Sequence, residues 1–179
     1  MNIRRRQAVL GLAMAPLPTW PQAPAWRLEA PNPVQISPRL LTSGQPTPQA
    51  LAGLGQRGFQ AVLYLAPSTV EDAVPEEPAI LARQGIAFVH IPIPFGAPTP
   101  AHVQAVSAAL SQRAAQQVLV HCQINLRAST MVFLHRVITL REPPAPAWQA
   151  VAQVWTPEGA WARLVQQQLK AHHIDFQPL

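Results

Sequence analysis

The sequence predicts an α/β domain with a mainly parallel, four-stranded sheet that is flanked by helices, followed by extra C-terminal helices. Short apolar runs of strand length alternate with segments of helical periodicity, which implies right-handed crossovers between parallel strands. The chain has 179 residues, of which 49% are hydrophobic, so it can form one domain with a substantial core. Its 21 prolines gather at the N-terminus and in the connections, which is typical of short elements joined by rigid loops.

The first 25 residues have the pattern of an export signal. Three arginines at 4–6 precede a short apolar run at 8–17, and small residues at 23–25 fit a cleavage site. The arginines also resemble, weakly, a twin-arginine signal, and the apolar run is too short for a membrane span. We therefore expect a periplasmic or secreted protein that meets the membrane only through the transient signal at 1–25. An uncleaved N-terminal anchor is the alternative.

Removal of this signal changes the charge of the chain. The whole sequence has a net charge of +5, whereas residues 26–179 contain ten basic and eight acidic residues, a net charge of +2. No basic stripe remains, so we expect no nucleic-acid partner. The single cysteine cannot form an internal disulfide, and an exported thiol without a partner is either buried in the core or chemically active.

The N-terminal part of the mature chain begins with a Pro-rich tether at 26–38, and the domain that follows spans 39–179. Its first strand covers 39–42. A helix then runs from Thr47, which suits the N-cap, to about Gly58, which suits the C-terminal stop.

The alternation of strands and helices continues through the rest of the domain. Two strand–helix pairs are expected at 61–65 with 76–84 and at 87–93 with 100–113. A third pair joins the buried strand at 117–121, which we expect to be central, to a helix at 127–140. Two further helices are marked by the tryptophans at 148, 155 and 161.

The residues that carry chemistry lie between the strand at 117–121 and the following helix. Ligands of open parallel sheets bind at the carboxyl ends of the strands, and the amides and dipole of a helix N-terminus favour an anion there. The same field lowers the pKa of a thiol, which makes Cys122 a candidate nucleophile. Arg127 can offer a planar fork to two oxygens of the anion. The residues expected to bind phosphate are Gln123, Ile124, Asn125, Leu126 and Arg127.

Neighbouring residues support this interpretation. A loop that curls around an anion needs a left-handed residue, and Asn125 is of the best type after glycine. Ser129 and Thr130 lie one turn into the helix, and the hydroxyl of either can hydrogen-bond a thiolate. We expect His121 to orient the loop, because its side chain points away from that of Cys122. The alternative is a buried, inert cysteine. No histidine has metal-ligand spacing to the cysteine, and we expect neither a metal nor a cofactor.

The segment Val120–Ser129 resembles the signature of the protein tyrosine/dual-specificity phosphatase superfamily, and more closely that of its bacterial beta-lactamase-hydrolase-like branch. The resemblance extends through Ser43-Gly44-Gln45-Pro46 and the strands to about residues 36–140, and the Trp-rich C-terminal helices also fit that branch. It implies a phosphatase fold in which Cys122 attacks phosphorus and Arg127 and the loop amides bind the phosphoryl oxygens. Water would then hydrolyse the phosphocysteine.

Two departures from the common phosphatase pattern keep other functions open. Four residues separate Cys122 from Arg127 instead of five, a loop length that resembles rhodanese sulfurtransferases, whose cysteine carries a persulfide. The usual general-acid aspartate is also absent, because the loop at 95–99 holds no carboxylate. Asp72, in the loop after the second strand, is the residue expected to replace it. Glu71 beside it is an alternative, and His102 is a poorer one.

Three functions therefore compete. The first is a cysteine-dependent hydrolase of phosphate monoesters, protein-tyrosine-phosphatase-like and weak if the general acid is missing. The second is a non-catalytic module that binds phosphate or another anion, and the third is a rhodanese-like sulfurtransferase. For the first, the expected partner is a phosphorylated small molecule or a phosphoprotein.

Overall fold

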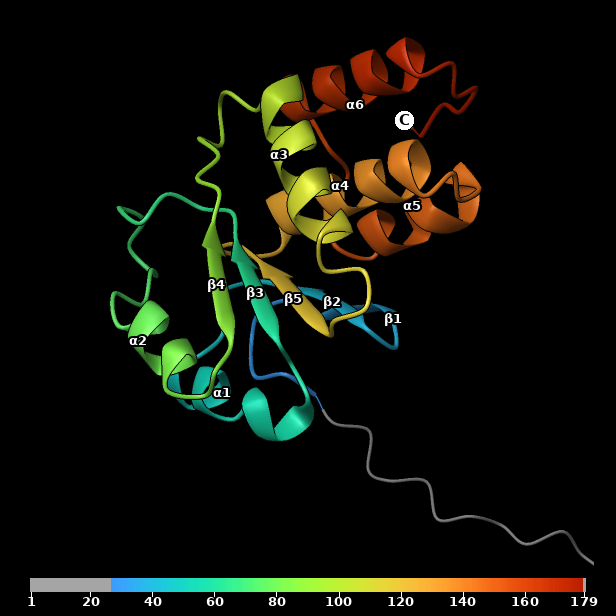
Figure 1. Ribbon diagram of the computed structural model, residues 1–179. Helices are drawn as coiled ribbons and strands as arrows, with labels where there is room; N and C mark the ends of the chain where they lie inside the picture. Colours follow the sequence, from blue (N-terminus) through green and yellow to red (C-terminus); the bar gives the residue numbers. More distant parts are fainter. Residues whose placement is uncertain (1–26, 179) are drawn as a thin grey trace, which may run out of the picture.

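The computed structural model describes residues 27–178 of the chain (Figure 1). The export signal predicted at 1–25 thus lies outside the described residues. Within them, no helix has both the length and the apolar character that a membrane span requires.

The domain is built on a five-stranded sheet in the order β1-β2-β5-β3-β4. The strands are β1 (Val34–Ser37), β2 (Leu40–Ser43), β3 (Ala61–Tyr64), β4 (Ala87–His90) and β5 (Val118–His121). All neighbours pair in parallel except β1, which runs antiparallel to β2. The α/β class, the mainly parallel sheet and the central position of β5 are therefore confirmed, with one strand more than expected.

The additional strand comes from the segment that we expected to be a tether, and that expectation is wrong for Val34–Ser37, which form β1. Val34 and Leu28 are buried in the core, and β1 completes one edge of the sheet. Pro33 and Pro38 lie directly on either side of β1 and do not interrupt it. Proline is tolerated at such ends of an edge strand, so a proline-rich composition concealed a real element.

Helices cover both faces of the sheet. On one face lie α1 (Pro48–Ala52) and α2 (Glu77–Ala82), and on the other lie α3 to α6 (Figure 1). The second group comprises α3 (Pro100–Ser111), α4 (Leu126–Leu134), α5 (Pro144–Ala152) and α6 (Gly159–Ala171). A 3₁₀ turn, Gly55–Arg57, follows α1, and a π-helical turn, His135–Thr139, continues α4. The C-terminal helices expected from the tryptophans are present.

Because both faces are covered, the strands are buried on both sides, as parallel sheets require. Val62 and Leu119 join the smaller core beneath α1 and α2. Val118 and Val120 join the larger core on the opposite face, which also contains Cys122. The end of β5 therefore delivers Cys122 to the face on which α4 begins.

Local signals in the sequence account for the ends of α1. The Thr47 hydroxyl accepts a hydrogen bond from the amide of Ala50 at 3.1 Å, as expected of an N-cap. Gly58 ends the following turn with a φ of 85°, a left-handed conformation that glycine adopts without strain.

Candidate active site

The loop that follows β5 turns directly into α4. Asn125 occupies the N-cap position of α4 with a φ of 73°, so the predicted left-handed conformation is present. Its side chain makes no capping hydrogen bond to the helix. The first amides of α4, those of Leu126, Arg127 and Ala128, therefore have no side-chain cap. Such amides form an anion site together with the helix dipole.

Cys122 lies at the base of this loop and is fully buried. Its backbone amide donates to the carbonyl of Ser43 at 3.2 Å, which ties the loop to the end of β2. Burial alone does not separate a nucleophile at the bottom of an anion pocket from an inert core cysteine. The surroundings of the loop separate the two.

Arg127 is the most informative of these surroundings. The residue is only 4% exposed, yet no carboxylate pairs with it among residues 27–178. Its Nε donates to the carbonyl of Ile93 at 2.9 Å, and one terminal nitrogen donates to the side-chain oxygen of Gln123 at 3.3 Å. Its guanidinium carbon lies 5.1 Å from the centre of the Phe95 ring. A guanidinium has more donors than these contacts use, so Arg127 retains capacity for an anion.

A cavity of about 220 Å³ opens beside this arginine. Its lining residues are Phe95, Gln123, Ile124, Leu126 and Arg127. Four of these five belong to the predicted loop, so the structure brings four of the five expected phosphate-binding residues to one cavity, whereas Asn125 and Cys122 do not line it. Phe95 was not expected there. It comes from the loop after β4, whose residues 95–99 contain no carboxylate.

The side chain of Asn125 has a second function that its backbone conformation does not reveal. Its amide nitrogen donates to the carbonyl of Asn32 at 2.6 Å and to the hydroxyl of Thr42 at 3.1 Å. The residue is fully buried. It therefore fastens the loop to β2 and to the segment before β1.

Gly44 explains why the short motif after β2 belongs to the site. A Cβ at this position would lie 2.5 Å from the carbonyl oxygen of Gln123 and 2.7 Å from Cβ of Pro31. The next amide, that of Gln45, donates to the same Gln123 carbonyl at 2.9 Å. Only glycine lets these three backbone segments pack so closely.

His121 orients the end of β5 through a buried polar network. Its Nε2 lies 2.7 Å from a carboxylate oxygen of Glu77, and the side-chain amide of Gln45 donates to the other oxygen at 3.0 Å. Glu77 is 1% exposed and begins α2, on the face opposite Cys122. This agrees with the expected direction of the His121 side chain. Glu77 could not be singled out from the sequence, because a glutamate in the first turn of a helix is ordinary.

An aromatic stack continues from His121 along the carboxyl ends of the strands. The Tyr64 ring stacks between those of His121 and His90, with centroid distances of 4.8 and 5.0 Å. Burial raises the pKa of Tyr64 to about 12, and the carboxylates of Asp72 and Glu77 add to this shift. The phenol is therefore neutral at physiological pH.

The remaining predicted residues are less directly placed. Asp72 lies exposed in the turn region after β3. Its charge contributes to the pKa of Tyr64, as do the charges of Arg127 and Cys122. Asp72 thus lies at the same edge of the sheet, but it does not line the cavity. The hydroxyl of Ser129 donates to the carbonyl of Leu126 at 3.2 Å, so its proton is not directed to Cys122. No group of three or more metal-ligating residues is found within 27–178.

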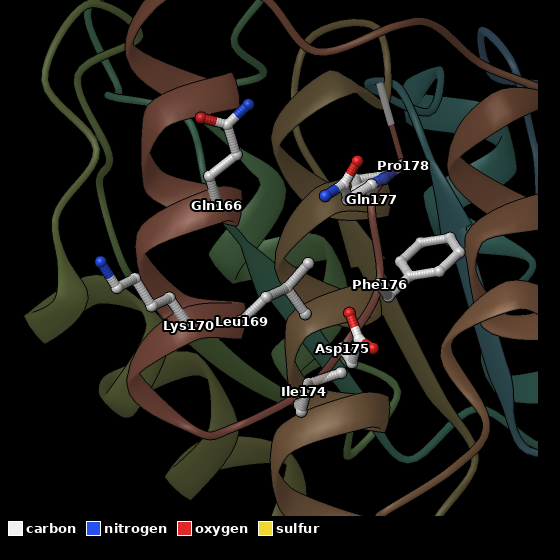
Figure 2. A pocket seen from close by; sticks show the side chains of 8 residues that line it. All are labelled: Gln166, Leu169, Lys170, Ile174, Asp175, Phe176, Gln177 and Pro178. Atoms are coloured by element: carbon white, nitrogen blue, oxygen red, sulfur yellow. The ribbon is translucent and has the colours of Figure 1, made fainter.

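A larger cavity of about 420 Å³ lies elsewhere, between α6 and the C-terminal segment (Figure 2). Leu169 of α6 points toward Ile174 across it, whereas the side chain of Lys170 extends away from the C-terminal segment (Figure 2). None of the residues predicted to form the site lines this larger cavity. Size alone would favour this cavity, but residues of the predicted loop line the smaller one.

Comparisons with known proteins agree with a phosphatase fold. Residues 21–162 match the family described as "DSP-PTPase phosphatase fused to NAD+ Kinase". A DUF442 phosphatase from Shewanella putrefaciens CN-32 is 30% identical, with a TM-score of 0.73 over 80% of this chain and 92% of that one. These matches confirm the resemblance to phosphatases predicted from the sequence.

Two further similarities are narrower. The Beta-lactamase hydrolase-like protein of Xylella fastidiosa (strain Temecula1) is 32% identical over 108 residues, which are 59% of this chain. This chain spans about a quarter of the length of that relative, since the match covers 25% of it. The structure of Tk-PTP in its active form has a TM-score of 0.63 over 82% of this chain and 99% of that one. At 22% identity it shows the fold alone.

Proposed function

The chain belongs to the DSP-PTPase phosphatase family, and from this premise we propose that it hydrolyses phosphate monoesters through a phosphocysteine intermediate on Cys122. The observation that carries the proposal is the buried guanidinium of Arg127, which no carboxylate neutralises within residues 27–178. Burial of an uncompensated charge is costly. A bound phosphoryl group would compensate it and would accept hydrogen bonds from the helix amides.

The reaction follows from these placements. The thiolate of Cys122 attacks phosphorus, the P–O bond to the ester oxygen breaks, and the leaving oxygen takes a proton. Water then attacks the phosphocysteine, the S–P bond breaks, and inorganic phosphate leaves. Arg127 and the amides of the loop stabilise the charge on the phosphoryl oxygens in both steps. Asp72 is the proposed proton donor of the first step.

A non-catalytic anion-binding module is the second candidate. It is favoured by one observation, namely that no carboxylate or imidazole lines the cavity beside Arg127. A site with a cradle but no proton donor can bind a phosphate without turning it over. The sulfurtransferase alternative rests only on the four-residue spacing in the loop.

Three assays on the same preparation separate these functions. An aryl phosphate such as p-nitrophenyl phosphate should be hydrolysed, with release of stoichiometric inorganic phosphate. Vanadate binding without any turnover would support the anion-binding module instead. Formation of thiocyanate from thiosulfate and cyanide, with no phosphate release, would support the sulfurtransferase.

We further propose that the protein acts outside the cytoplasm, on a phosphorylated small molecule or a phosphoprotein. The export pattern at 1–25 is the support for this location, and a start near Trp26 would leave all the described residues in place. Mass spectrometry of the protein from its native host should find this mature N-terminus. A full-length cytoplasmic form would contradict it.

A further inference from the structure

The segment before β1 contacts the anion-binding loop from outside. The side-chain amide of Asn32 donates to the carbonyl of Ile124 at 3.0 Å, across 92 positions of sequence. In return, the carbonyl of Asn32 accepts a hydrogen bond from the side chain of Asn125 at 2.6 Å. The side chain of each asparagine therefore binds the backbone of the segment to which the other belongs.

The backbone on both sides of this pair is unusual. Asn32 and Asn125 have φ values of 46° and 73°, in the left-handed region that few residues other than glycine enter. Such conformations persist where the surroundings hold them. Here Gly44 lies between the two segments, and its amide donates to the carbonyl of Pro31 at 2.6 Å. The close packing at Gly44 fixes the position of Asn32 against the loop.

We propose that Asn32 is a positioning residue for phosphate binding, a role that rests on the function proposed above. Asn32 does not line the cavity beside Arg127, so it acts through the loop and not on the ligand. Its amide keeps the carbonyl of Ile124 turned toward the outer segment. A backbone bridge to Gly44 also holds Ile124, and the hydrogen bond from Asn32 adds to it. Without this hydrogen bond the carbonyl of Ile124 can tilt toward the anion, and the carbonyl oxygen then repels the anion.

Asn32→Gly removes the side-chain amide and little else. Glycine adopts a positive φ without strain, and it retains the backbone carbonyl that Asn125 uses. Asn32→Asp is a harsher variant of nearly the same shape, because its carboxylate would face the carbonyl of Ile124. Gln35→Ala is the matched control. Gln35 is also exposed and also donates to carbonyls, but these belong to its own hairpin, at Ser37 and Leu40.

The experiment measures vanadate affinity, the KM for p-nitrophenyl phosphate and the Tm of the full chain and its variants. We expect Asn32→Gly to weaken vanadate binding and raise KM by about three- to tenfold, the effect of one hydrogen bond. Asn32→Asp should weaken both further, and Gln35→Ala should change neither. The Tm of Asn32→Gly should stay within about 2 °C of the wild type, a change too small to explain the loss of affinity.

Two results overturn the proposal in different ways. If the wild type binds vanadate and Asn32→Gly binds it equally well, Asn32 has no positioning role, whatever its Tm, while the proposed function stands. If the wild type neither binds vanadate nor hydrolyses the ester, the proposed function fails and the role of Asn32 fails with it.

Discussion

Arg127 brings a positive charge to a place where the residue is 4% exposed, and its side-chain partners are a carbonyl, an amide oxygen and an aromatic face. These are neutral groups, so they satisfy donors without neutralising the charge. The side-chain oxygen of Gln123 occupies one N–H of the fork at 3.3 Å, a long contact that a phosphoryl oxygen can replace with a stronger one. The geometry of the guanidinium thus matters as much as its charge.

The importance of the guanidinium geometry, beyond its charge, predicts the behaviour of Arg127→Lys. The variant keeps the charge and loses the planar fork, so phosphate and vanadate affinity should fall by about 10- to 100-fold, as expected for charge-assisted hydrogen bonds of roughly 1.5–3 kcal/mol. Turnover of p-nitrophenyl phosphate should fall at least as much. Arg136→Lys is the control, because Arg136 also forms a forked contact, with Glu142 at 2.7 and 2.8 Å, outside the cavity lining. Equal affinities in both variants would remove Arg127 from the site.

Tyr64 is the single tyrosine of the chain, so its ionisation can be followed without interference from another. Burial, reinforced by Asp72 and Glu77, raises the pKa of Tyr64 from 10.0 to about 12. A raised pKa means that the protonated phenol stabilises the fold below pH 10, and this contribution is lost as pH rises from 10 to 12. Tyrosinate absorbance at 295 nm should therefore appear near pH 12 in the native protein and near pH 10 in urea. A native transition at pH 10 would show that the stack is open to water.

Asp72 is the proposed proton donor for the leaving group. If it donates the proton, Asp72→Asn should slow hydrolysis of an alkyl or phenyl phosphate by about 100-fold, within the usual range for a general acid. The same variant should hydrolyse p-nitrophenyl phosphate within about threefold of the wild type, because that leaving group needs little protonation. Glu71→Gln, one position away in the same exposed turn, tests the alternative donor and should leave both rates unchanged if Asp72 is the acid. An equal loss with both substrates would contradict a proton-donor role.

At the scale of elements, α2 is attached to the central strand by one buried carboxylate. Glu77 accepts from Gln45 and contacts His121, and so joins α2, the segment after β2 and the end of β5. Two other polar atoms of this network, the side-chain oxygen of Gln45 and Nδ1 of His121, have no partner among the described residues. The network is therefore sensitive to the loss of any member.

Two substitutions of Glu77 should lower the free energy of unfolding by clearly different amounts. Glu77→Ala leaves Nε2 of His121 buried without an acceptor and leaves the amide of Gln45 with only the long 3.5 Å contact to the carbonyl of Pro46, which should lower the free energy of unfolding by roughly 2–4 kcal/mol. Glu77→Gln should cost about 1 kcal/mol or less, because Gln45 can turn its amide and present its unpartnered oxygen to the new side chain. Urea denaturation of the two variants measures the difference. Equal losses would mean that the charge of Glu77, and not its hydrogen bonds, stabilises this junction.

The elements themselves were largely predictable, because their signals are local. A few residues of sequence were enough to predict the buried strand β5, the N-cap at Thr47 and the left-handed conformation of Asn125. The strand β1 did not, because flanking prolines gave its segment the composition of a linker. Composition averages over a window, whereas an edge strand needs only four suitable residues between its prolines.

At the scale of the whole molecule, the sequence predicted the loop of the site but not the residues that support it. Cys122, Asn125 and Arg127 are neighbours in sequence, so their spacing carried the prediction. The partners Asn32–Ile124 and Glu77–His121 lie 92 and 44 positions apart, and no period or motif connects residues at such distances. They become neighbours only when β2 and β3 pair on either side of β5.

The central claim is that Cys122 forms the phosphocysteine, and the turnover of Cys122→Ser tests it most directly. Serine has nearly the same shape but is a far weaker nucleophile than a thiolate, while the amides and Arg127 that bind the anion are unchanged. We predict that Cys122→Ser loses at least about 1,000-fold in the rate of p-nitrophenyl phosphate hydrolysis. Added phosphate or vanadate should still raise its Tm as it does in the wild type. Hydrolysis at the wild-type rate by a folded Cys122→Ser variant would contradict the account.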